Sequence, residues 1–171
     1  YAVPGNRAAC FELTKAELFG GFNPAGLTVS ALEKVSITTG SGTLALTEVS
    51  EPAGSGASSE EADSDSVSYQ TVWRLDSAPE SDLDSDTVQD LLSALAGYVS
   101  AQVTGADPAA YGFDAPLATV QAETADGTAT LQYASNADGC WLMQDGDSSV
   151  YAVDVSVVNA ILQAAESLQG K

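Results

Sequence analysis

The sequence predicts an α+β domain in which antiparallel β-hairpins form a sheet and two or three amphipathic helices pack on it. Three observations lead to this fold class. Extended runs with apolar residues are joined by short glycine-containing turns, which is typical of hairpins. Other stretches place apolar residues at helical spacing behind a capping residue. Finally, segments from the two halves of the chain are similar to each other, which indicates an internal duplication.

The first 22 residues are predicted to be the tail of a preceding repeat-like module, ahead of a main α+β domain over residues 23–171. Tyr1 to Val3 suits a short strand. Thr14 and Glu17 form a capping-box signal for a short helix that ends at two glycines. The chain starts without a methionine, so we expect an excised soluble portion of a longer protein, with any membrane anchor outside it.

The main domain is predicted to begin with a hairpin whose strands run from Val29 to Thr39 and from Thr43 to Val49. Residues 50–66 are rich in serine, glycine and acidic residues and contain little to bury. They predict a disordered or mobile acidic loop. Val67 to Leu75 then alternates apolar and polar residues, which predicts a third strand.

The clearest helix is predicted just after this strand. Asp84 or Ser85 supplies its N-cap, and acidic residues suit its positive N-terminal end. Four apolar residues at helical spacing form one stripe for burial. A second such helix closes the chain, capped by Asp154 or Ser156. The two stripes are Val88, Leu91, Leu92 and Leu95, and then Val158, Ile161, Leu162, Ala165 and Leu168.

Between the helices lies the run Tyr111-Gly112-Phe113-Asp114-Ala115-Pro116, preceded by a single predicted helical turn at 107–110. Gly112 permits a positive φ, and Pro116 pushes Ala115 out of the helical region. The run therefore predicts a tight turn that feeds a strand. Hairpins are expected around Asp126-Gly127 and around residues 145–147.

Two internal similarities support the duplication. Tyr1-Ala2-Val3 recurs as Tyr151-Ala152-Val153, each ahead of an amphipathic stretch. The segment 35–46 also aligns with 120–131 at a constant offset, with threonine, glycine and leucine at matching places. Both copies of the longer segment predict a strand, a glycine turn and a return strand.

Composition excludes several classes of function. The net charge is −19, with 24 acidic residues against five scattered cations, so a phosphate backbone and an anionic membrane surface would both be repelled. We therefore expect no nucleic-acid partner, and contact with a membrane only through an anchor outside this fragment. The chain has no histidine, which removes histidine-dependent catalysis and imidazole-bound zinc. The acidity is interpreted as a solubility device in an extracytoplasmic setting.

The two cysteines, Cys10 and Cys140, fit no zinc spacing, and they form either a disulfide or two small buried apolar side chains. The acidic run 60–65 suggests calcium, but a solvated loop is the preferred interpretation. The segment from Asp145 begins like a calcium loop and then enters a strand, so it is interpreted as a hairpin turn. No metal, cofactor or catalytic residue is assigned from the sequence.

The order of these motifs resembles a bacterial cell-envelope family known as domain of unknown function 4340. The resemblance spans residues 29–168 and includes Trp73-Arg74-Leu75, the capped helix, the turn from Tyr111 to Pro116 and the Asp-Gly hairpin. Its motif residues Trp73, Tyr111, Gly112, Phe113, Asp114 and Pro116 are expected to be structural. Asp114 in particular is expected to accept hydrogen bonds from turn amides. Family members resemble auxiliary components of an export system linked to gliding motility.

The resemblance implies a non-catalytic extracytoplasmic module of a membrane-anchored envelope protein, such as a lipoprotein, with an envelope protein as its partner. An exposed apolar patch or an open sheet edge would distinguish this function. The alternative is a glycan- or calcium-binding domain, with aromatic residues on an open face or converging carboxylates. A third hypothesis, an acid-catalysed hydrolase, needs two carboxylates across a cleft. The aromatic candidates are Tyr69, Trp73, Tyr111, Tyr133, Trp141 and Tyr151.

Overall fold

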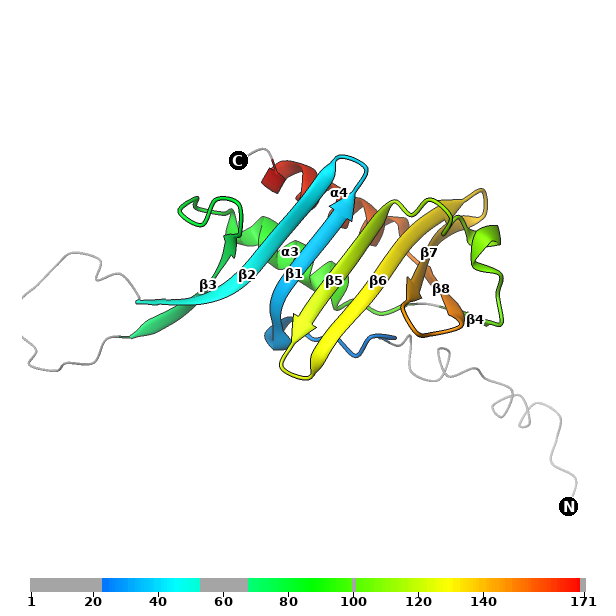
Figure 1. Ribbon diagram of the computed structural model, residues 1–171, viewed down its shortest axis with the longest axis horizontal. Helices are drawn as coiled ribbons and strands as arrows, with labels where there is room; N and C mark the ends of the chain where they lie inside the picture. Colours follow the sequence, from blue (N-terminus) through cyan, green and yellow to red (C-terminus); the bar gives the residue numbers. More distant parts are fainter. Residues whose placement is uncertain (1–22, 53–67, 100, 170–171) are drawn as a thin grey trace, which may run out of the picture.

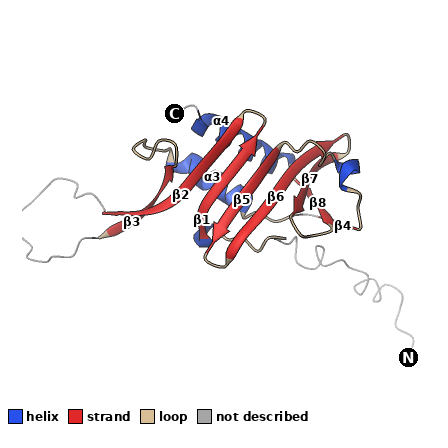
Figure 2. Cartoon of the chain, viewed as in Figure 1, coloured by secondary structure: helices blue, strands red, loops and turns tan. Residues whose placement is uncertain are grey.

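The structure, a computed structural model, describes residues 23–52, 68–99 and 101–169. At its centre is one eight-stranded sheet with the order β3-β2-β1-β5-β6-β7-β8-β4, in which all neighbouring strands are antiparallel. The helices α3 and α4 lie on the same face of this sheet (Figures 1 and 2). The predicted α+β class with an antiparallel sheet is therefore confirmed. The segment 1–22, with its predicted strand and helix, lies outside the described residues.

The elements follow one another along the chain as two hairpin-rich halves, each closed by a helix. The strands are β1 (Leu32–Thr39), β2 (Gly42–Pro52), β3 (Tyr69–Leu75), β4 (Ala101–Thr104), β5 (Ala118–Thr124), β6 (Gly127–Asn136), β7 (Gly139–Gln144) and β8 (Ser149–Val153). The helices are α3 (Ser85–Leu95) and α4 (Val155–Gln169), with short 3₁₀ turns η2 (Val29–Ala31) and η3 (Pro108–Tyr111).

The first hairpin differs from the prediction at both ends. Val29 to Ala31 forms a 3₁₀ turn rather than strand, and β1 begins at Leu32, which is fully buried. At the other end β2 continues through residues 50–52, which the composition had placed in the acidic loop. Pairing with β3 extends the strand there, because Glu51 lies opposite Gln70 and Pro52 opposite Tyr69. The rest of the predicted loop, residues 53–66, lies outside the described residues.

The hairpins β1–β2 and β5–β6 share one register. Thr39 lies opposite Gly42, and Thr124 lies opposite Gly127 at the same offset along the chain. In each turn the threonine hydroxyl donates to the glycine carbonyl oxygen, over 3.4 and 3.1 Å. The two hairpins stand side by side in the sheet because β1 pairs with β5. The matching segments of sequence thus have matching local structure.

Helix α3 confirms the predicted cap and stripe. The Asp84 carboxylate accepts a hydrogen bond from the Thr87 N–H over 3.1 Å, and all four predicted apolar residues are buried. Helix α4 also follows its pattern, with one correction. Leu162 is only half-buried, whereas Ala164, which the sequence pattern left out, is buried. The other four predicted residues are buried, and Ala164 joins them where α4 packs against α3 as well as the sheet.

The two faces of the sheet differ. The main core lies between the sheet and the helices and includes Ile37, Leu46, Leu91 and Ile161. A smaller cluster on the opposite face joins Phe113 to Ala134 and Val150, where η3 and the turn after it cover β6 and β8. Within the described ranges, neither helix combines the length and apolar character needed to cross a bilayer.

Candidate functional site

A groove of about 360 Å³ runs along the outer edge of β3 and separates this strand from α3. One wall consists of the five consecutive residues Gln70 to Arg74. Successive side chains of a strand point to opposite faces, so a groove on one face would be lined only by every second residue. Because all five residues line this groove, it follows the edge of the strand. The other wall is formed by the loop before α3 and by one side of the helix, with both buried and exposed residues. Its residues are Asp82, Leu83, Ser85, Val88, Gln89 and Leu92.

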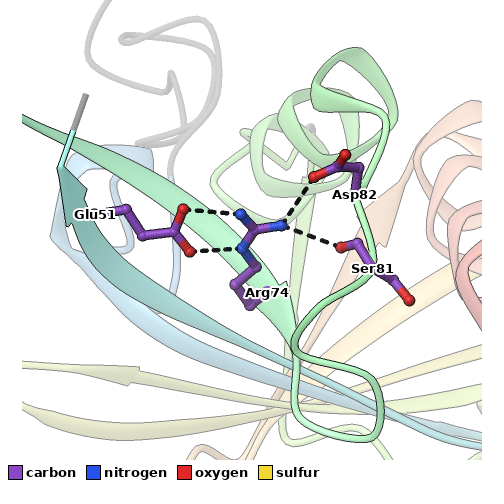
Figure 3. Close-up of polar contacts among 4 residues, drawn as sticks. All are labelled: Glu51, Arg74, Ser81 and Asp82. Atoms are coloured by element: carbon purple, nitrogen blue, oxygen red, sulfur yellow. Dashed lines mark hydrogen bonds and ion pairs between the residues drawn. The ribbon is translucent and has the colours of Figure 1, made fainter. Parts of the chain in front are cut away.

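Arg74 fixes one end of this groove (Figure 3). Its guanidinium donates two parallel hydrogen bonds of 2.8 Å to the Glu51 carboxylate on β2. A third nitrogen donates to the Ser81 carbonyl oxygen and to the Asp82 carboxylate, each over 3.2 Å. The planar, bidentate contact is the geometry that arginine favours with carboxylates. Arg74 therefore ties the β2–β3 hairpin to the loop that precedes α3.

The ion pairs leave this end of the molecule with excess negative charge. The hydrogen bonds raise the pKa of Arg74 above its usual range, and the contact with Arg74 lowers the pKa of Glu51. Nearby, the Thr47 hydroxyl and the Lys34 ammonium lower the pKa of Asp76. Both cations of the described residues, Lys34 and Arg74, are thus paired with carboxylates. The Asp82 side chain remains fully exposed beside the groove.

The backbone of β3 faces the groove at alternate residues. Asp76 donates its N–H to the Ala45 carbonyl oxygen on the β2 side, and Leu75 turns its carbonyl the other way, to the Ala78 N–H. In an antiparallel ladder the backbone N–H and C=O groups of successive residues point alternately to one side of the strand and the other. Thr71 and Trp73 therefore point these groups away from β2, as Leu75 does. Within the described residues no strand pairs with that side of β3. The edge from Tyr69 to Trp73 is therefore available for a further strand.

A second polar cluster lies at the opposite end of the sheet, around the β7–β8 turn. The Asp147 carboxylate accepts one hydrogen bond from the Tyr151 hydroxyl and another, of 2.9 Å, from the Ser149 N–H. Gln102 on the edge strand β4 donates to the Ser149 hydroxyl over 2.9 Å. The Tyr151 hydrogen bond lowers the pKa of Asp147, whereas burial raises the pKa of Tyr151. The residues satisfy one another, which indicates a structural role in holding the turn.

We expect Asp147→Asn to destabilise the domain by about 1 kcal/mol at pH 7, because an amide donor would replace an acceptor that faces Tyr151. Folding lowers the pKa of Asp147. The carboxylate therefore contributes its full stabilisation at pH values above its pKa in the unfolded chain, and this stabilisation is lost as the pH falls through its pKa in the folded chain. Urea unfolding of the unchanged protein and of Asp147→Asn, at pH 7 and at pH 3, measures this dependence. The difference in unfolding free energy between the two proteins is expected to be smaller at pH 3.

The exposed Asp145→Asn variant, in the same turn, controls for the removal of one charge. An Asp147→Asn effect that is equal at both pH values would contradict the role of the ionised carboxylate.

The turn from Tyr111 to Pro116 follows η3 and packs beside strand β6. Gly112 ends η3 with a φ of 89°, as the turn requires. Tyr111 contacts Trp141 edge to face, with ring centroids 4.7 Å apart, and Phe113 is buried in the smaller cluster. Asn136, which the sequence did not single out, accepts from the Trp141 indole and donates to the Ala110 carbonyl oxygen. The turn is a packed corner of the fold rather than a pocket.

The interpretation of Asp114 needs correction. Its side chain is exposed, and no hydrogen bond from a described residue reaches its carboxylate. The turn is closed instead by the Ala115 N–H donating to the Gly112 carbonyl oxygen, over 3.2 Å. Just before the turn, the Asp107 carboxylate caps η3 by accepting from the Ala109 N–H. Pro116, two residues later, is also exposed.

The aromatic candidates divide between core and edge. Tyr133 and Tyr151 are buried, and burial raises the pKa of Tyr133. Trp141 packs on Tyr111, far along the sheet from the groove. Trp73 is half-buried, packs against the main core and lines the groove, while Tyr69 is 66% exposed at the start of β3. Of these candidates only Trp73 lines the groove, and Tyr69 lies at the start of the strand beside it.

Metal and thiol chemistry receive little support from the described residues. Among them, no three acidic or cysteine side chains gather closely enough to hold a metal ion. Cys140 is half-buried on β7 and packs against the main core. Cys10 lies outside the described residues, so the predicted alternatives of a disulfide and two buried thiols both stay predictions.

Comparison with known proteins bears on the family. The family described as a domain of unknown function (DUF4340) matches residues 73–171, more than half of the chain. The chain belongs to this family. No curated protein and no solved structure matches it. The DUF4340 match begins at Trp73, so it is shorter at the N-terminal side than the expected span of 29–168 and leaves out β1 and β2.

The site of this DUF4340 chain therefore spans the boundary of the matched region. Arg74, Asp82 and α3 lie inside it, whereas Glu51 lies on β2 outside it. Sequence reasoning missed the contact between Arg74 and Glu51 because it had placed Glu51 in a mobile loop. Even the strand register would not have revealed it, because Glu51 lies opposite Gln70, four residues from Arg74, beyond the direct and diagonal pairs that interact across a ladder.

Proposed function

We propose that this chain is a non-catalytic extracytoplasmic module of a membrane-anchored bacterial envelope protein, and that it binds another envelope protein. The supporting observation is the exposed β3 edge, which runs beside a groove and lacks a strand partner among the described residues. A transport-accessory role is part of the proposal and rests on the resemblance to export components. The net charge of −19 suits a protein that must stay soluble while it presents a sheet edge.

The alternative, a glycan- or calcium-binding domain, called for aromatic residues on an open face or for converging carboxylates. Among the described aromatic residues, Tyr98 is exposed by itself after α3, and the others are divided between the core, the corner at η3 and the β3 edge. The carboxylates with the clearest geometry, Glu51 and Asp82, converge on an arginine. These placements favour a protein partner over a sugar or a metal ion.

We also propose that the two halves of the domain arose by internal duplication. The hairpins β1–β2 and β5–β6 share their register and the threonine-to-glycine hydrogen bond in the turn. A duplicated hairpin explains how the matched DUF4340 region and the strands before it form one continuous sheet.

The test is photo-crosslinking in living cells that produce the full-length anchored protein. A photoreactive residue replaces Thr71 on β3 in one variant and the exposed Thr128 on β6 in another. We expect a discrete adduct with one envelope protein, identified by mass spectrometry and then shown to bind the purified chain. The absence of a specific adduct from both positions would contradict the proposal.

Localisation is tested separately by fusing the full-length protein to alkaline phosphatase, which is active only outside the cytoplasm. Activity of the fusion is expected, and an inactive but stable fusion would contradict an extracytoplasmic address.

A further inference from the structure

We infer that the groove beside β3 binds an extended, lysine- or arginine-bearing segment of a partner protein, which adds to the sheet as a ninth strand. This inference rests on the proposed function, since it names the chemistry of the partner. Strand addition to an exposed edge is a recurring mode of peptide recognition, in which backbone hydrogen bonds give affinity and pockets for alternate side chains give specificity. Both features are present along β3.

The hydrogen-bonding groups come from alternate residues of the edge. Thr71 and Trp73 point their N–H and C=O groups toward the groove, in the same direction as Leu75 and opposite to Asp76. Beyond Trp73 the edge is already covered, because Leu75 forms a bridge with Ala78. The open part thus runs from Tyr69 to Trp73, which suits about five residues of an added strand.

The groove also supplies a place for side chains. Trp73, Leu83, Val88 and Leu92 form its apolar lining, and Trp73 and Leu83 pack against the main core. Because side chains of an added strand would alternate between the two faces of the sheet, every second one would turn toward α3 and this lining. An apolar residue is expected at those positions of the partner.

Charge decides which partner fits. The Glu51, Arg74 and Asp82 side chains together carry one net negative charge, and the Asp82 carboxylate is fully exposed at the end of the groove. A lysine or arginine of the partner would complete this cluster. At longer range the charge of −19 attracts basic segments and repels acidic ones, which raises the rate of encounter with the former.

The same charge argues against a second copy of this chain as the occupant. The run from Tyr69 to Trp73 contains no lysine, proline or bulge, the devices by which edge strands usually avoid self-pairing. Two chains of charge −19 would have to approach each other at this edge. Repulsion between copies therefore protects an edge that stays open to a basic partner. The other edge strand, β4, has only four residues.

The binding test uses the full 171-residue chain, labelled with ¹⁵N, and two synthetic nine-residue peptides. In one peptide valine and lysine alternate, and in the other valine and glutamate alternate. We expect the lysine peptide to shift the amide signals of Tyr69 to Trp73 and of the Trp73 indole, and the glutamate peptide to leave them unchanged. Raising the salt concentration from 50 to 200 mM should weaken binding roughly threefold, as screening predicts. Equal binding of both peptides, or shifts only away from β3, would overturn the inference.

Variants of β3 test the backbone contact. Thr71→Pro removes an N–H that points into the groove and leaves the ladder with β2 intact, so the chain should still fold. We expect it to bind the lysine peptide roughly five- to tenfold more weakly than Thr71→Ala, which keeps the N–H. Asp82→Asn should weaken binding roughly two- to fivefold. Equal affinities of Thr71→Pro and Thr71→Ala would overturn strand addition.

Two further results separate the inference from the proposed function. Dimers that form at the β3 edge without peptide, and that Thr71→Pro abolishes, would assign the edge to a second copy and overturn the inference. Failure of the peptide tests together with a specific envelope adduct from Thr128 would overturn the inference alone, since partner binding would then use another surface. A specific adduct from neither position removes the proposed function itself.

Discussion

Gly112→Val is expected to destabilise the domain by about 3–5 kcal/mol in urea unfolding. Gly112 has a φ of 89°, a conformation that costs L-residues about 1–2 kcal/mol and β-branched residues more. A Cβ at this position would also lie 2.5 Å from the Ser135 carbonyl oxygen, which is backbone in strand β6 and cannot turn aside. Moving β6 would disturb the cluster of Phe113, Ala134 and Val150. Since a domain is stable by only about 5–15 kcal/mol, the loss would be a large fraction of the total.

A matched pair of alanine variants separates the two causes. Gly146 also has a positive φ, 81°, but a Cβ there would meet nothing within 4 Å. Gly146→Ala therefore measures the backbone cost alone, about 1–2 kcal/mol, while Gly112→Ala adds the contact with Ser135. We expect Gly112→Ala to be the more destabilising by at least about 1 kcal/mol. Equal losses would mean that the corner has room for a side chain and that φ alone requires glycine.

The parts of the fold that the sequence predicted well are those decided by neighbouring residues. Asp84 caps α3 because its carboxylate lies three residues from the Thr87 N–H, a distance fixed by helix geometry. The positive φ at Gly112 follows from the turn residues around it. The Asp126-Gly127 turn sets the register of β5 and β6. In each case the interacting residues lie within a few positions of one another, so the local sequence is enough to predict the feature.

The parts that were missed depend on contacts between distant residues. Strand β4 contains only Ala101 to Thr104 and exists because it pairs with β8, about fifty residues later. Residues 50–52 have the composition of a loop but form strand opposite β3. The candidate site has the same origin, since Glu51 and Asp82 meet at Arg74 only after β2 and β3 are paired. Its function is consequently proposed from the edge and the groove rather than from any motif.

Leu91→Ala is expected to have the second large effect, a loss of about 3–5 kcal/mol in urea unfolding. Leu91 is completely buried on α3, at the centre of the stripe that packs between the sheet and α4. Removing a leucine side chain from such a place loses its transfer free energy and leaves a cavity that the surrounding elements fill only in part. Far-ultraviolet circular dichroism, followed through the transition, measures the change.

Leu162→Ala is the matched control, because it is the same substitution in a helix at a half-buried position. It should cost about 1–2 kcal/mol, since less apolar surface is buried and water replaces part of the lost contact. The contrast also tests the packing of α4, whose predicted stripe included Leu162. Equal losses at the two sites would mean that Leu162 is as buried as the pattern predicted, and that α4 is rotated relative to the structure described above. The α3 wall of the β3 groove depends on the same packing, so that result would also change the shape of the candidate site.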